Sequence, residues 1–160
     1  MKAKHMIFLA GIAVCQTGLT QTQTPAHSDI EGYIALMRSD VQAKKVDIIR
    51  QNLTLTEEQG KKFWPLQRSY ANELATLADE RVNVIREYAE NWETLSDSSA
   101  KTLGNRMLDY QSKRVDLRKK YFDRMTKDLS ATIAAKFFQI EMTLEDLIDL
   151  GISSSVPLVK

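Results

Sequence analysis

Histidine and cysteine, the side chains that most often carry nucleophilic or metal chemistry, occur only within the first 27 residues. The two histidines are His5 and His27, and the single cysteine is Cys15. Without either residue type in the body of the chain, no Ser–His or Cys–His nucleophile and no metal site with nitrogen or sulfur ligands can be assembled there. The sequence also contains no glycine-rich phosphate loop. It therefore predicts a protein that is not an enzyme and that holds no metal or other cofactor.

Two arginines stand on apolar faces of the predicted helices. Arg81 lies at the centre of one apolar stripe and Arg114 at the centre of another. An unpaired buried guanidinium is very costly, so each needs a carboxylate partner or open water. One interpretation is an internal ion pair, for example with Asp128 or Glu141. The other is an open concave surface, on which guanidinium groups and aromatic rings together bind a polypeptide client.

Positive charge is concentrated between residues 113 and 127, where seven basic residues face two acidic ones. Acidic residues in the last predicted helix could pair with these basic residues. These charges are either solvated faces with cross-helix pairs or a basic, aromatic-rich patch that attracts acidic or unfolded chains. Flexible methionine and aromatic groups suit varied clients. The polypeptide-binding hypothesis takes in Arg81, Arg114, Arg118, Arg124, Phe63, Tyr70, Tyr110, Tyr121 and Met125.

These side chains must be positioned by long helices. Thr56 is a good N-cap, and Gln59 can close a capping box with it. Apolar residues then recur at steps of three and four from Phe63 to Leu95, which predicts one long amphipathic helix. Pro65 lies inside this pattern, and because the stripe continues in phase we expect a kink rather than an end.

Three further helices are predicted. The first runs from Ser28 to about Asn52, and the third from about residue 100 to 127. The short loop 96–99 between the second and third helices implies an antiparallel hairpin, with Asp97, Ser98 or Ser99 as the next cap.

Ser130, after Leu129, can cap the fourth helix, and Gly151 stands where a helix-ending glycine belongs. We therefore expect a single all-α domain over residues 27–151 and an extended tail over 152–160.

The N-terminus has the pattern of an export signal. Lys2 and Lys4 precede an apolar run over residues 6–15, which is too short to span a bilayer as a stable anchor. We expect residues 1–26 to be removed, by cleavage somewhere between 15 and 27, which would place the chain in the periplasm. The alternatives are an uncleaved N-terminal anchor and lipidation of Cys15. Export and the near balance of 22 basic and 21 acidic residues argue against nucleic acid as a partner.

The third predicted helix carries an unusually wide apolar band. Two neighbouring rows, one through Leu103 and Leu117 and the other through Leu108, Val115 and Phe122, cover about half its circumference. One antiparallel neighbour cannot cover so much surface. Either several helices cover it or part of it is a binding surface, and for this reason we expect a homodimer.

The motif Leu55-Thr56-x-x-Gln59 at the start of a long helix, in a small exported helical chain, resembles the LTXXQ-motif periplasmic proteins of the Spy and CpxP type. The segment Leu129-Ser130-Ala131-Thr132-Ile133 stands where this family has a second copy, with isoleucine in place of glutamine. The resemblance implies a cradle-shaped helical homodimer, and an ATP-independent chaperone or an envelope-stress accessory protein. The histidines used by the metal-binding relatives are not present in the body of this chain.

Three hypotheses for function follow. The first is a periplasmic chaperone-like protein that binds unfolded or stress-damaged polypeptides, and an exposed concave apolar patch ringed by arginine and lysine would favour it. The second is an accessory or regulatory protein with one dedicated envelope partner, such as a sensor kinase, and a flat, localised patch would favour it. The third is a helical module whose apolar bands are simply core, with no patch at all.

Overall fold

The computed structural model describes residues 44–155, with side chains described as far as Gly151, and over this range the protein is all-α as predicted. No strand occurs in the described part of the chain. The predicted export signal, most of the first helix and the last five residues lie outside the described range. The elements are a helical segment at 44–52, α2 (Glu57–Asn91), a 3-10 turn (Trp92–Thr94), α3 (Asp97–Asp128) and α4 (Ala131–Ser155).

The start of α2 follows the predicted capping box. The Thr56 side chain accepts a hydrogen bond from the backbone N–H of Gln59 at 3.3 Å, and the Gln59 side chain accepts one from the backbone N–H of Thr56 at 2.9 Å. Leu55, the first residue of the motif, packs against the core. The helix continues through Pro65 for more than six further turns. The motif residues therefore have a structural role that is confirmed by these contacts.

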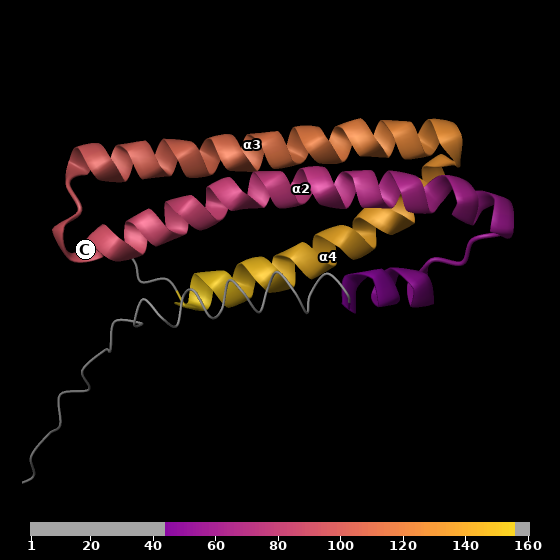
Figure 1. Cartoon of the computed structure of the whole chain (residues 1–160), viewed down its shortest axis with the longest axis horizontal. Helices are drawn as coiled ribbons and strands as arrows, with labels where there is room; N and C mark the ends of the chain where they lie inside the picture. Colours follow the sequence, from indigo (N-terminus) through magenta and orange to yellow (C-terminus); the bar gives the residue numbers. More distant parts are fainter. Residues whose placement is uncertain (1–43, 156–160) are drawn as a thin grey trace, which may run out of the picture.

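The long hairpin is formed by α2 and α3, which run antiparallel beside each other (Figure 1). The prediction for the start of α3 was wrong by three residues. Ser96, rather than Asp97, Ser98 or Ser99, is the cap, and its hydroxyl accepts from the backbone N–H of Ser99 at 3.1 Å. Because Ser96 is the first residue of the loop that can cap the free N–H groups of the first helical turn, the helix begins directly after it.

α4 folds back from the end of α3 and crosses the hairpin (Figure 1). Only Leu129 and Ser130 separate the two helices, and the Ser130 hydroxyl accepts from the backbone N–H of Ile133 at 3.2 Å, as predicted. Gly151 does not end α4, which continues to Ser155. A glycine inside a helix costs only about 1 kcal/mol, so a helix-ending role for Gly151 needed a second stop signal, and Pro157 lies too far on.

The hydrophobic core lies where α2, α3, α4 and the 44–52 segment meet. Ile49 of the short segment and Leu53, which directly follows it, pack with aromatic residues of the three long helices. α4 therefore provides much of the cover that the wide apolar band of α3 requires. No helix of the described part is long and apolar enough to cross a bilayer.

Candidate functional site

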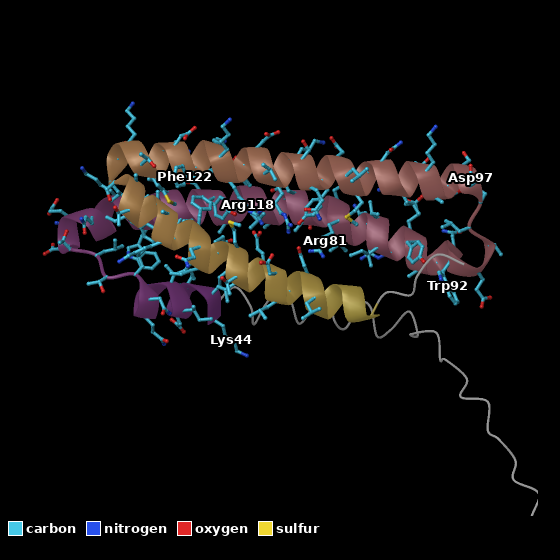
Figure 2. All side chains as sticks on the ribbon, turned by 180° about the vertical axis from the view of Figure 1, so that it is seen from behind. Lys44, Arg81, Trp92, Asp97, Arg118 and Phe122 are labelled. Carbon is cyan, nitrogen blue, oxygen red and sulfur yellow. The ribbon has the colours of Figure 1, made fainter. Side chains whose placement is uncertain are left out.

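The structure gathers most of the predicted polypeptide-binding residues on one side of the hairpin, the side that α4 crosses. We call this side the inner face. Figure 2 shows two of its residues, Arg81 of α2 and Arg118 of α3, where α4 passes over the pair of helices. The inner face comprises Phe63, Tyr70 and Arg81 from α2 and Tyr110, Arg114, Arg118, Tyr121 and Met125 from α3.

One end of the inner face is aromatic and belongs to the core, which corrects part of the sequence-based hypothesis. Phe63, Tyr70, Tyr121 and Met125 are almost completely buried. The Phe137 ring of α4 lies 5.4 Å from Phe63 and 5.8 Å from Tyr70, in edge-to-face geometry that stabilises aromatic pairs. Because α4 supplies this cover, the four side chains do not form a surface that a client could reach in this conformation.

The other end is an arginine cluster, Arg81, Arg114 and Arg118, in which the first two lie over the Tyr110 ring. Asp149 of α4 joins two of these arginines. Its Oδ1 accepts from Arg81 at 2.5 Å, and its Oδ2 accepts from both Nη atoms of Arg114 at 3.1 and 3.2 Å. The guanidinium carbons of the same two arginines stand 5.9 and 5.6 Å from the centre of the Tyr110 ring. The cluster is therefore a basic site with an aromatic floor, occupied by a carboxylate.

Two further carboxylates of α4 continue the same pattern. Glu145 accepts from Arg118 and lies 3.8 Å from Arg114. Glu141, which is almost fully buried, pairs with Lys45 of the 44–52 segment. The arginines are thus in internal ion pairs, one of the two interpretations that the sequence left open. The partners are Asp149 and Glu145, however, and not Asp128 or Glu141, because α4 extends far enough along the hairpin to bring its last turns over the cluster.

The ion pairs between α4 and the arginine cluster use the terminal nitrogens of the guanidinium groups. Arg81 donates through one Nη atom, Arg114 through both and Arg118 through one.

The attachment of α4 differs between its two halves. In the first half, Ala134, Phe137 and Phe138 are buried among aromatic rings. In the second half Glu145 is buried, Leu144, Ile148 and Asp149 are half-buried, and Leu147 and Leu150 are 62% and 68% exposed. Apolar burial stabilises far more reliably than ion pairs, whose desolvation opposes their attraction. The second half of α4 is therefore the more weakly held one.

Arg124 lies outside the inner face. It is exposed, and its guanidinium carbon stands 4.8 Å from the centre of the Tyr121 ring. The Tyr121 hydroxyl donates to Glu73 of α2 at 2.7 Å, and Lys120 donates to the other oxygen of Glu73 at 2.7 Å. The hydrogen bond from Lys120, followed by that from Tyr121, lowers the pKa of the Glu73 carboxyl below its usual value. This group of residues joins α2 to α3 at the edge of the hairpin.

Burial also affects Tyr70, the largest polar side chain beneath α4. Desolvation raises the pKa of its hydroxyl well above the usual value, and the negative charge of Glu141 adds to the effect, although Arg118 and Arg114 oppose it. The hydroxyl therefore stays neutral at any physiological pH.

A second feature is an exposed apolar row on α3, which reaches α4 only at Phe122. Leu108, Val115 and Phe122 follow one another at seven-residue spacing and are 69%, 56% and 36% exposed. The Phe122 ring lies 6.1 Å from Phe138 of α4, and Figure 2 labels Phe122 at this edge. We call these three residues the outer row. It is localised and it is formed by one helix.

The sequence analysis did not single out Lys45, Glu145 and Asp149 as site residues. The available signal was the four-residue spacing of Glu141, Glu145 and Asp149, which places the three carboxylates on one face of a helix. An acidic strip inside an otherwise apolar helix indicates that basic partners lie opposite.

No group of three or more potential metal ligands occurs among residues 44–155. Comparison with protein-family models, with curated proteins and with solved structures gives no match for this chain.

Proposed function

We propose that this chain is a non-catalytic, chaperone-like protein of the periplasm, which binds unfolded or stress-damaged polypeptides without ATP at the arginine cluster. The observation that carries the proposal is that this cluster already holds a polypeptide helix, the second half of α4, through carboxylates. The expected site in the sequence combined arginines with aromatic residues. We retain the arginines and Tyr110 for this role and leave out Phe63, Tyr70, Tyr121 and Met125, because these four side chains are buried in the core.

Access to the cluster requires the second half of α4 to move. Ion pairs join Glu145 and Asp149 to the hairpin, and none of the described apolar side chains in this half is fully buried, so we expect local opening to cost much less than global unfolding. The first half of α4 remains anchored by Phe137 and Phe138. Opening would uncover Arg81, Arg114 and Tyr110 together. A basic surface with an aromatic floor attracts acidic and partly unfolded chains.

The test is suppression of light scattering by a reduced or heat-unfolded client, with the chain from His27 onward at substoichiometric and equimolar ratios and no ATP. Asp149→Asn, which loosens the second half of α4, is compared with Asp146→Asn, an exposed control on the same helix. We expect suppression by the wild type, stronger suppression by Asp149→Asn, and no change for Asp146→Asn. Failure of both the wild type and Asp149→Asn on several unrelated clients would refute the proposal.

The second candidate is an accessory protein with one dedicated envelope partner, and the outer row favours it. Residues repeated every seven positions on one helix form the seam that a partner helix of the same repeat can pack against. Lys101, which continues the seven-residue spacing, and Lys119, four positions after Val115, are both exposed, so the partner helix would carry acidic residues opposite them. Under this candidate Val115→Lys abolishes capture of the partner and leaves scattering suppression unchanged.

A further inference from the structure

Three carboxylates of α4, Glu141, Glu145 and Asp149, stand four positions apart and form an acidic ladder. The ladder is about 12 Å long, from the rise of an α-helix. Each step meets a cation from a different part of the chain. Glu141 meets Lys45, Glu145 meets Arg118, and Asp149 meets Arg81 together with Arg114. The cations thus follow α4 at the pitch of a helix, with Lys45 on the 44–52 segment and the arginines on the inner face.

We infer that the inner face recognises this carboxylate spacing, and that its preferred ligand in trans is an acidic amphipathic helix with carboxylates four residues apart. The inference rests on the proposed function and names the class of polypeptide that the site selects. The occupant is defined by charge complementarity, since the cations that the second half of α4 covers are arginines. A planar guanidinium presents a rigid set of donors that matches a carboxylate better than a lysine does.

The geometry at Asp149 shows how the spacing is read. Each of its two oxygens accepts from a different arginine, one on α2 and one on α3. A carboxylate can make this bridge only when it projects between the two helices of the hairpin. A carboxylate moved by one position along a ligand helix would be rotated by about 100° and would miss both guanidinium groups. The bridge between the two arginines therefore selects the position of the carboxylate along the ligand helix as well as its charge.

α4 competes with any ligand in trans for the arginine cluster, and it has the advantage of being tethered, which gives it an effective concentration of about millimolar order. Binding in trans to the wild type is therefore weak until the second half of α4 is loosened.

The test uses the full mature chain and a fluorescent peptide with the sequence of residues 137–151, measured by anisotropy. The control peptide has identical composition, but Glu145 and Asp149 are each exchanged with the residue that precedes them. We expect the peptide to bind Asp149→Asn about tenfold more tightly than the wild type. In the wild type the second half of α4 occupies the arginine cluster in most chains, and the apparent affinity for the peptide falls in proportion to the fraction of chains in which the cluster is open. Asp146→Asn should behave as the wild type, and the control peptide should bind about tenfold more weakly.

Equal binding of the two peptides, or no binding to Asp149→Asn, would overturn the inference. The outcome is separable from that of the proposed function. If the chain suppresses scattering but binds both peptides equally, the chaperone-like role stands and the recognition of carboxylate spacing is refuted. If the chain distinguishes the two peptides but does not suppress scattering, the recognition of spacing stands and the chaperone-like role is refuted. Sedimentation in parallel tests a second copy as the occupant. A dimer of Asp149→Asn that excess unlabelled peptide does not dissociate would also overturn the inference.

Discussion

Removal of one partner of the Arg118–Glu145 pair should destabilise the chain more than removal of both. The Glu145 side chain is 6% exposed and that of Arg118 is 19% exposed. Glu145→Met leaves Arg118 buried without its carboxylate, and breaking a buried pair in this way costs about 3 kcal/mol, at the low end because the arginine keeps some contact with water. Arg118→Met costs less, about 2 kcal/mol, since Arg114 remains 3.8 Å from Glu145.

In the double variant both charges are replaced by apolar side chains of similar length, which is close to neutral. We expect its free energy of unfolding to lie within about 1 kcal/mol of the wild type. The assay is urea and thermal unfolding followed by circular dichroism at 222 nm. Glu145→Met should lower the Tm by about 12 °C, since 1 kcal/mol corresponds to about 4 °C in a domain of this size. The reasoning would be refuted if the loss of unfolding free energy in the double variant equalled the sum of the losses in the two single variants.

Three further predictions concern the rest of the fold. Phe137→Ala should destabilise the chain by about 3 to 5 kcal/mol in urea unfolding, because it leaves a cavity among buried rings. Thr56→Ala should cost about 1 kcal/mol in the same assay through loss of the N-cap, and an unchanged midpoint would contradict the role of the capping box. The pKa of Glu73 is lowered in the folded state, so its stabilising contribution is present above its ordinary value of 4.5 and is lost as the pH falls through the folded-state pKa. Glu73→Gln should therefore flatten the acid side of the stability–pH curve, measured by urea unfolding between pH 3 and 6, and an unaltered slope would contradict the assignment.

The local parts of the fold follow from the sequence because short-range chemistry specifies them. The capping box at Thr56 and the cap at Ser130 depend on residues three positions apart, and both are confirmed. The end of α4 was predicted wrongly because Gly151 carries an ambiguous signal, being a common helix end and also a tolerated interior residue. The helical periodicity predicted which faces are apolar, but not which helix covers which face.

The candidate site depended on that missing long-range information. The sequence showed that Arg81 and Arg114 need partners, and burial physics limited these to carboxylates or water. The choice of Asp149 was set by the angle at which α4 crosses the hairpin, which depends on the packing of Phe137 and Phe138 many residues away. The homodimer and the export of the chain remain predictions.

The central claim, that the second half of α4 uncovers the arginine cluster for a polypeptide, is tested most directly by hydrogen–deuterium exchange with mass spectrometry. The account predicts that the backbone amides of residues 143–151 exchange faster than those of 134–141 in the free chain, since ion pairs hold the former and buried rings the latter. It also predicts that exchange at 143–151 rises when an unfolded client is bound, while 134–141 stays protected. Equal protection of both halves, unchanged by the client, would contradict the claim.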